Sequence, residues 1–243
     1  KNPNWEDRDY FVLSKGHAGP GLYSTLANVG FFDKDWLYTL NEGGTIKNLG
    51  VDYSKGATIY NSEIGGLTDS NFGIIDCCFV SGSINGNPAG SILSFGGLVG
   101  YGNGIIRNCY NLATLTAAGN MTRVGGIVGY TTSTRKFSHI VSKADINVSG
   151  NIQNSQYIAG CVSYTAGSLD NCQNLGNISV NPTSSATYEF TVSGITALSG
   201  DITNCINGSD KDGEIGKYGN ITISGTLNRV NNFGGISSKQ ATN

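Results

Sequence analysis

The stretch GGLVGYGNGIIRNCYN, from Gly96 to Asn111, joins two short phrases that recur along most of the chain. The first phrase, typified by GIIRNC, begins at Gly44, Gly73, Gly104, Arg135, Gly167 and Gly200. These starting points lie 29, 31, 31, 32 and 33 residues apart. The second phrase, typified by GGIVGY, begins at Gly65, Gly96, Gly125, Ala159, Ser193 and Gly234. Two phrases that keep their order over six copies indicate a repeat architecture.

Residues that can be buried occupy fixed positions within each copy. The third residue of the first phrase is Ile46, Ile75, Ile106, Phe137, Leu169 or Ile202. The sixth is Leu49, Cys78, Cys109, Ile140, Cys172 or Cys205. The third residue of the second phrase is Leu67, Leu98, Ile127, Cys161, Ile195 or Ile236. One repeat has too few such residues to form a core alone, so we expect equivalent residues of neighbouring repeats to stack.

The spacing of these inward residues requires a bend inside the first phrase. Inward positions of a straight strand alternate with a period of two, whereas here they lie three apart. The fifth position supplies the bend, because Asn tolerates the left-handed backbone region and its stacked amides can bond along a ladder. This position holds Asn48, Cys77, Asn108, His139, Asn171 and Asn204. The paired glycines of the second phrase mark another corner.

These features predict a mainly β fold, a right-handed parallel β-solenoid of about six coils of about 31 residues, with about three short strands per coil. The phrases GGLVGY, GGIVGY and IRNCYN resemble the GLUG-type repeats of bacterial surface and secreted proteins, from Gly44 to Ser238. The resemblance implies an extracellular β-solenoid with a structural or adhesive role, and it supplies no catalytic residue.

The first 43 residues follow another pattern, which predicts a short αα-hairpin. Pro20 is suited to a helix start and Gly30 to its end. Asp33 is a suitable N-cap for a second helix that ends at Gly43. We therefore divide the chain into a helical segment, 1–43, and a repeat domain, 44–243. An open solenoid end exposes an apolar edge, so we expect the hairpin to pack over the Gly44–Leu67 coil or to stay loosely ordered, and in neither case to form a thiamine site.

The sequence of residues 1–45 resembles the amino-terminal part of the transketolase family. The matching segments are DRDYFVLSKGHAGPGLY, which begins at Asp7, and GFFDKDWLYTLNEGGT, which begins at Gly30. The resemblance implies that His17 lies near thiamine diphosphate. The family's metal-binding segment and activating Glu do not follow, so we interpret His17 as non-functional. The two parts are joined near Thr45 by fusion, engineering or an assembly error.

Composition excludes several classes of function. The chain has 243 residues, of which 13% are charged, and its formal net charge is −2. It has no basic stripe for nucleic acid and no stretch long enough to cross a membrane. No signal peptide is visible, but Lys1 is not an initiator Met, and the sequence is interpreted as a fragment or a processed product.

Four candidate sites have simpler structural interpretations. The pairs Cys78–Cys109 and Cys172–Cys205 lie one coil apart, within disulfide reach, but we expect buried free thiols. His139 is interpreted as a substitution at the Asn position. The segment NGSDKDGEIG, from Asn207 to Gly216, has glycines where a calcium loop needs acids and is interpreted as a turn insertion. Asp76 and Asp170 share the fourth position but lie three coils apart, too far for paired acid catalysis.

Three hypotheses about function remain open. The first is a non-catalytic extracellular stalk or adhesive module of a bacterial surface protein, without cofactor or metal, which binds a host or bacterial surface glycan or protein. The second is a transketolase-type fragment, which requires thiamine diphosphate and Mg²⁺. The third is a carbohydrate-active β-solenoid.

Overall fold

The computed structural model describes residues 44–86, 91–118, 120–150, 155–182, 190–209, 211, 214, 216–224 and 231–240. Every regular element within these ranges is a β-strand. The predicted αα-hairpin, with His17, lies outside the described residues. Among the described residues, no helix is long and apolar enough to cross a membrane.

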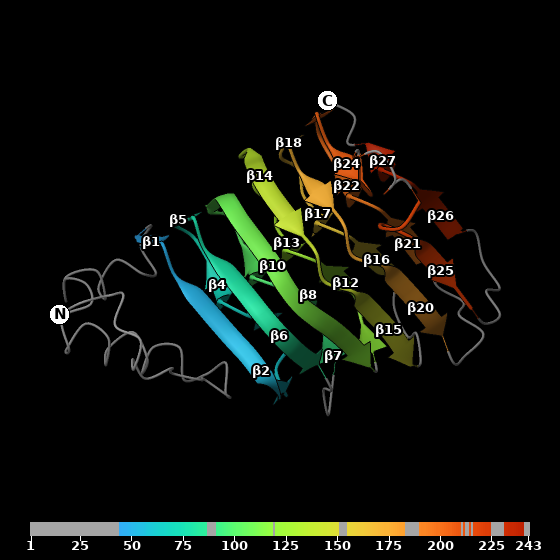
Figure 1. Ribbon diagram of the computed structural model, residues 1–243, viewed down its shortest axis with the longest axis horizontal. Coiled ribbons are helices and arrows are strands. Elements are labelled where there is room, and N and C mark those ends of the chain that lie inside the picture. The colour runs from blue at the N-terminus through green and yellow to red at the C-terminus, as the bar shows by residue number, and fades with distance from the viewer. Residues whose placement is uncertain are drawn as a thin grey trace.

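The strands form three long parallel sheets and one short one (Figure 1). Sheet 1 has 13 strands. It contains β1 (Thr45–Lys47), β2 (Gly50–Ile59), β5 (Ile74–Asp76), β6 (Phe79–Gly86), β10 (Ile105–Ala118), β14 (Phe137–Ser142), β15 (Ile146–Gly150), β18 (Leu169–Asp170), β19 (Gln173–Asn174), β20 (Ile178–Pro182), β23 (Ile202–Thr203), β24 (Ile206–Asn207) and β25 (Ile221–Ile223).

Sheets 2 and 3 each contain one strand from every repeat. Sheet 2 contains β3 (Glu63–Gly65), β8 (Ser94–Gly96), β12 (Arg123–Gly125), β16 (Gln156–Ala159), β21 (Phe190–Ser193) and β26 (Asn231–Gly234). Sheet 3 contains β4 (Thr68–Asn71), β9 (Val99–Gly102), β13 (Val128–Tyr130), β17 (Val162–Tyr164), β22 (Thr196–Ser199) and β27 (Ser237–Gln240). The short pair is β7 (Ser91–Ile92) with β11 (Asn120–Met121).

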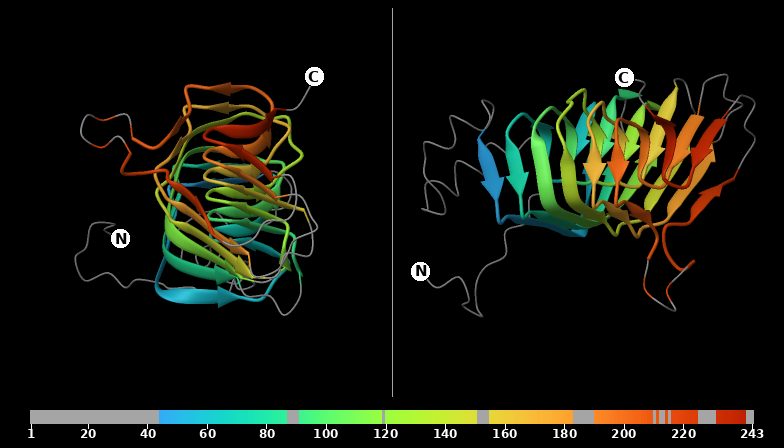
Figure 2. Two further views of the ribbon diagram at one scale, coloured as in Figure 1. Left: turned by 90° about the vertical axis from the view of Figure 1, so that its right-hand side faces the viewer. Right: turned by 90° about the horizontal axis from the view of Figure 1, so that it is seen from above.

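The chain is a β-solenoid, as the repeat predicts. Figure 2 shows successive coils following one another from the blue to the red part of the chain. Sheets 2 and 3 have six strands each, so the chain passes each of these faces six times and completes about five full turns. The three sheets correspond to the three strands expected per coil. Sheet 1 bends at the fifth position of the first phrase.

The predicted inward positions form the core in the predicted register. Ile75 pairs with Ile46 on one side and Ile106 on the other, and Cys109 pairs with Ile140. The third-position side chains of the four inner repeats are at most 1% exposed. Those of the end repeats, Ile46 and Ile202, are only partly buried. Complete burial therefore requires a coil on both sides.

The bend in the first phrase is a single residue with left-handed backbone geometry. The fifth position has a φ between 51° and 57° in all six repeats, and these six are the non-glycine residues with positive φ among those described. Cys77 and His139 adopt this geometry although they are not Asn, which confirms that His139 occupies the Asn position. Such a φ reverses the strand's inward and outward sides, so residues three apart both face the core.

The predicted ladder of amides at this position is not what the structure shows. Asn108 and Asn204 instead donate their side-chain N–H groups to carboxylates of the preceding coil, Asp76 and Asp170, at 2.8 and 3.1 Å. An amide pair along the axis occurs three residues later, where Asn174 Nδ2 donates to Asn207 Oδ1 at 2.8 Å.

The second corner, between sheets 2 and 3, depends on the glycine pair. A Cβ on Gly97 would overlap the side-chain amide of Asn111 and the carbonyl oxygen of Gly126. That amide is fully buried and donates to Gly126 O at 2.8 Å, while its oxygen accepts from Ala113 N at 2.9 Å. The missing side chain therefore makes room for a polar contact that satisfies the backbone inside the corner.

The bend geometry gives the first prediction, at Asn171. Val at this position should destabilise the fold by about 1–2 kcal/mol, because a β-branched residue disfavours the left-handed region. Gly adopts this region freely, so Asn171→Gly should cost much less. Thermal unfolding of the two variants checks this order. Equal melting temperatures for Asn171→Val and Asn171→Gly would contradict the assigned geometry.

Candidate functional site

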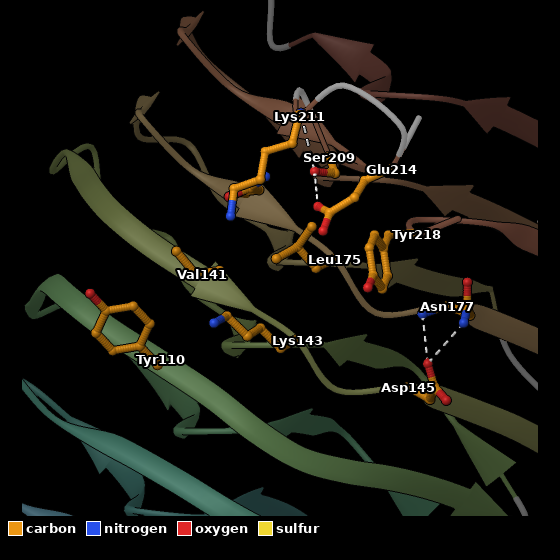
Figure 3. Close-up of a pocket in the computed structure, with 11 residues that line it drawn as sticks. Tyr110, Val141, Lys143, Asp145, Leu175, Asn177, Ser209, Lys211, Glu214 and Tyr218 are labelled. Atoms are coloured by element: carbon orange, nitrogen blue, oxygen red, sulfur yellow. Dashed lines mark hydrogen bonds between the residues drawn. The ribbon is translucent and has the colours of Figure 1, made fainter. Parts of the chain in front are cut away.

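A groove of about 660 Å³ lies beside sheet 1, on its solvent-exposed side (Figure 3). Val141, Gln173 and Leu175 come from neighbouring coils and are partly buried, so they form its floor. Tyr110 of β10 and Tyr218 lie on opposite sides of Leu175 in this view. The volume lies within the range of small-molecule binding sites in proteins.

One wall of the groove is the insertion in the sixth repeat. Between the aligned pairs Asn174–Asn207 and Ile178–Ile221, the sequence of this coil has 13 residues where that of the preceding coil has three. The ends of this insertion meet, because Asn207 Nδ2 donates to Gly219 O and Gln173 Nε2 donates to Gly208 O, both at 2.9 Å. The interpretation of this segment as a turn insertion is therefore confirmed.

The described residues of the insertion bond to one another above the groove. Ser209 Oγ donates to Glu214 Oε2 at 2.7 Å, and Glu214 N donates to Lys211 O at 3.0 Å. Lys217 N then donates to Glu214 O at 3.0 Å. The Glu214 carboxylate and the Tyr218 ring both line this wall (Figure 3).

A chain of polar groups borders the other end of the groove. Asp145 Oδ1 accepts from Asn177 N and Nδ2 at 2.8 and 3.2 Å. Asn177 Oδ1 in turn accepts from Asn220 N and Nδ2 at 3.2 and 3.1 Å. Lys143 and Lys211 also line the groove, and neither forms an ion pair with any residue that the structure describes.

A second surface feature is a ladder of aromatic rings along sheet 3. Phe72, Tyr101, Tyr130 and Tyr164 follow one another on consecutive coils, with ring centroids 5.9, 5.6 and 5.3 Å apart. The Arg123 guanidinium lies 3.8 Å from the centroid of the Tyr130 ring. Arg123 Nε is buried and makes no hydrogen bond within the described structure, so the ring contact replaces a polar partner. We call this feature the tyrosine ladder.

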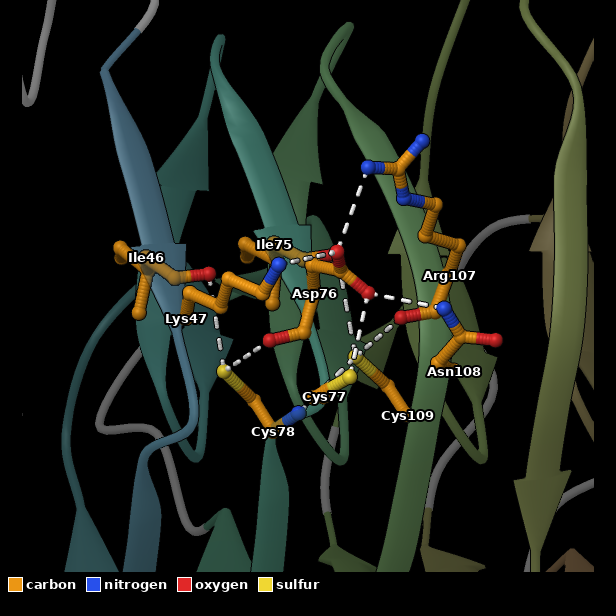
Figure 4. Close-up of polar contacts among 9 residues, drawn as sticks. All are labelled: Ile46, Lys47, Ile75, Asp76, Cys77, Cys78, Arg107, Asn108 and Cys109. Carbon is orange, nitrogen blue, oxygen red and sulfur yellow. Dashed lines mark hydrogen bonds and ion pairs between the residues drawn. The ribbon is translucent and has the colours of Figure 1, made fainter.

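Asp76 is the centre of a charged cluster at the corner of sheet 1 (Figure 4). Its buried carboxylate accepts from Asn108 Nδ2 at 2.8 Å and from Arg107 Nη2 at 3.2 Å. On the preceding coil, Lys47 Nζ lies 3.5 Å from Asp76 Oδ2. The Asn108 hydrogen bond, assisted by those from Cys77 and Arg107, lowers the pKa of Asp76 to about 2. Asp76 therefore joins three coils and stays ionised.

Asp170 repeats this arrangement further along the axis. It pairs with Lys136 Nζ at 2.8 Å and accepts from Thr203 Oγ1 at 2.8 Å. The hydrogen bond from Lys136, followed by that from Thr203, lowers the pKa of Asp170. The two acids that sequence reasoning considered as a catalytic pair thus each bind their own neighbouring coils.

All six cysteines are free thiols in the structure. Within the predicted pairs, Cys78 N donates to Cys109 Sγ and Cys172 N donates to Cys205 Sγ, both at 3.4 Å. Burial raises the pKa of Cys161. Cys78, Cys109, Cys161 and Cys172 are buried free thiols that pack like small apolar residues, as the sequence predicts. Cys205 is only partly buried, and Cys77 is exposed at the bend.

Sequence reasoning missed the groove, although it identified the insertion. His17 lies outside the described residues, and His139 is exposed at the bend. No group of three or more His, Cys, Asp or Glu residues that could hold a metal lies within the described part of the chain. The position of the insertion could have indicated the groove. An insertion in one coil lies beside the outward residues of the preceding coil, and these include Gln173 and Leu175.

The Asp76 cluster gives the second prediction. Its pKa lies below the ordinary 3.8, so its contribution to stability is complete above about pH 4 and is lost as the pH falls towards 2. The wild type should therefore lose more thermal stability than Asp76→Asn when the pH is lowered from 4 to about 2. Asp170 is unchanged in both proteins and serves as the internal control. If the wild type and Asp76→Asn lost the same thermal stability over this pH range, the Asp76 carboxylate would contribute nothing to the stability of the fold.

Comparison with known proteins yields one partial relative. The chain is 44% identical over 64 residues to the 6-deoxy-6-sulfo-D-fructose transketolase subunit of Clostridium sp. (strain MSTE9). This match covers 23% of the chain and 23% of that subunit. No protein family model matches the chain, and no solved structure matches it. The solenoid fold therefore rests on the chain's own structure, and a transketolase subunit is similar to only part of the chain.

Proposed function

We propose that the chain is a structural and adhesive module of a bacterial surface or secreted protein, built from GLUG-type repeats and working outside the cell. The resemblance of GGLVGY and GGIVGY to such repeats and the solenoid fold support this proposal. In this role the module needs no catalysis and no cofactor. Adhesion arises from many weak contacts that repeat along the axis.

The tyrosine ladder is the observation that carries the proposal. Its tyrosine rings lie on three consecutive coils and are partly exposed, so a partner meets the same chemistry three times along sheet 3. Tyr offers a large rigid contact surface with a polar hydroxyl and loses little conformational entropy on binding. Close packing of Tyr101, Tyr130 and Tyr164 restricts the rings further, which lowers this entropic cost.

Adhesion is tested with beads that carry the full chain on surfaces coated with mucin or with fibronectin. We expect the wild type to be retained under flow on at least one surface. The triple variant Tyr101→Ser, Tyr130→Ser, Tyr164→Ser should lose most of this retention, and each single variant should lose part of it.

The control is Tyr60→Ser, because Tyr60 is an exposed tyrosine outside the ladder. Circular dichroism checks that each variant keeps its β structure. The proposal fails if wild-type beads are retained no better than bare beads on both surfaces, or if the triple variant adheres like the wild type.

The 64-residue match favours a second candidate, a fragment of a thiamine diphosphate-dependent transketolase. The resemblance assigns His17 to the cofactor, but the described residues offer no group of three ligands for its metal. The segment that carries this resemblance, residues 1–43, lies outside the described residues. Calorimetry with thiamine diphosphate and Mg²⁺ separates the two candidates. Binding that is lost in a variant lacking residues 1–43 would favour the enzyme.

A third candidate, a carbohydrate-active solenoid, is favoured by the groove. Acid catalysis on sugars uses two carboxyl groups that flank the bond to be cleaved. Asp145 and Glu214 line the same groove, although they come from different coils. Release of reducing ends from a polysaccharide, abolished in Glu214→Gln, would support this candidate against the adhesive module.

A further inference from the structure

We propose that the groove beside sheet 1 binds a neutral, extended oligosaccharide that runs along the solenoid axis. The inference deepens the proposed adhesive function, on which it rests, by assigning a ligand class to a face other than that of the tyrosine ladder. Binding of such a ligand requires an apolar platform, a coil spacing that matches the spacing of the sugar units, and groove residues whose charges sum to zero. Each of these is present.

The platform consists of exposed rings and aliphatic side chains. Tyr110 is 45% exposed and Tyr218 is 41% exposed. Phe79, which pairs with Tyr110 in the neighbouring coil, is 42% exposed and extends this surface beyond the groove. Pyranose rings present C–H groups on their faces, and these pack on aromatic rings. Exposed apolar surface beside a groove is typical of a binding site.

The spacing of the coils matches the spacing of units in a sugar chain. Phe79, Tyr110, Val141 and Gln173 occupy equivalent positions on four successive coils. The coils are about 4.8 Å apart, which is close to the length of one pyranose unit in an extended chain. A ligand parallel to the axis therefore meets one residue of this row per sugar, and about four sugars span these coils.

The charges of the groove favour a neutral ligand. Lys143 and Lys211 face the same space as Asp145 and Glu214, so the four formal charges sum to zero. A polyanion would meet two carboxylates, and a polycation would meet two ammonium groups. Sugar hydroxyls both donate and accept hydrogen bonds, so a neutral sugar chain satisfies all four groups together with Asn177 and Gln173.

The strands below the groove disfavour an added peptide strand. A peptide that extends a sheet needs an edge with free backbone groups. Here β14 pairs with β10 on one side and with β18 and β19 on the other. Recognition must therefore use the side chains, which agrees with a ligand that binds through stacking and hydroxyl groups.

The test is calorimetry of the full chain with neutral hexasaccharides (cellohexaose, xylohexaose and mannohexaose) and with acidic hexagalacturonate. We expect at least one neutral ligand to bind more tightly than the acidic one. Tyr218→Ala and Tyr110→Ala should each raise its Kd about tenfold, as removal of an aromatic anchor does. Tyr218→Phe, which keeps the ring, should bind within about threefold of the wild type.

Tyr60→Ala is the matched control, an exposed tyrosine outside the groove, and it should leave the Kd unchanged. Tyr130→Ser changes the tyrosine ladder and should also leave the Kd of the oligosaccharide unchanged. The proposal is overturned if no neutral ligand binds, if hexagalacturonate binds more tightly, or if Tyr218→Ala binds like the wild type. Retention on coated surfaces depends on the ladder variants, so failure of the groove and failure of the adhesive function give different results.

Discussion

The fold depends on in-register stacking of identical positions between neighbouring coils. A single coil has only a few inward side chains, and its backbone N–H and C=O groups point along the axis towards the adjacent coils. Ile106 is buried because Ile75 and Phe137 occupy the same position on either side, whereas Ile46 and Ile202 in the end repeats stay partly exposed. Burial and hydrogen bonding are therefore shared between coils, and neither belongs to one coil alone.

Two corners keep this register and leave the outward faces for function. The left-handed residue in each first phrase lets two residues three apart both face inward. The glycine pair brings sheets 2 and 3 together around polar side chains such as Asn111. Because the corners fix which side of each strand faces out, they align Tyr101, Tyr130 and Tyr164 in one ladder and Tyr110, Val141 and Gln173 in one row across sheet 1.

Sequence reasoning could predict what repeats, but not what occurs once. The register, the bend and the glycine corner each appear in six copies, so their pattern is visible against the variation between copies. The groove depends on one insertion, whose position is set when Gly208 and Gly219 meet over Gln173. The Asp76 cluster was also missed, although the fourth positions carry alternating charges at Lys47, Asp76 and Arg107. Those charges become neighbours only once the coils are stacked.

The most direct test of this account compares two substitutions in one strand. Ile106 faces the core and its neighbour Ile105 does not. Ile106→Asp would bury an unpaired charge, and we predict a loss of several kcal/mol of stability or a failure to fold. Ile105→Asp should change stability by less than about 1 kcal/mol. Equal thermal stability of the two variants would contradict the stacked core on which the structure depends.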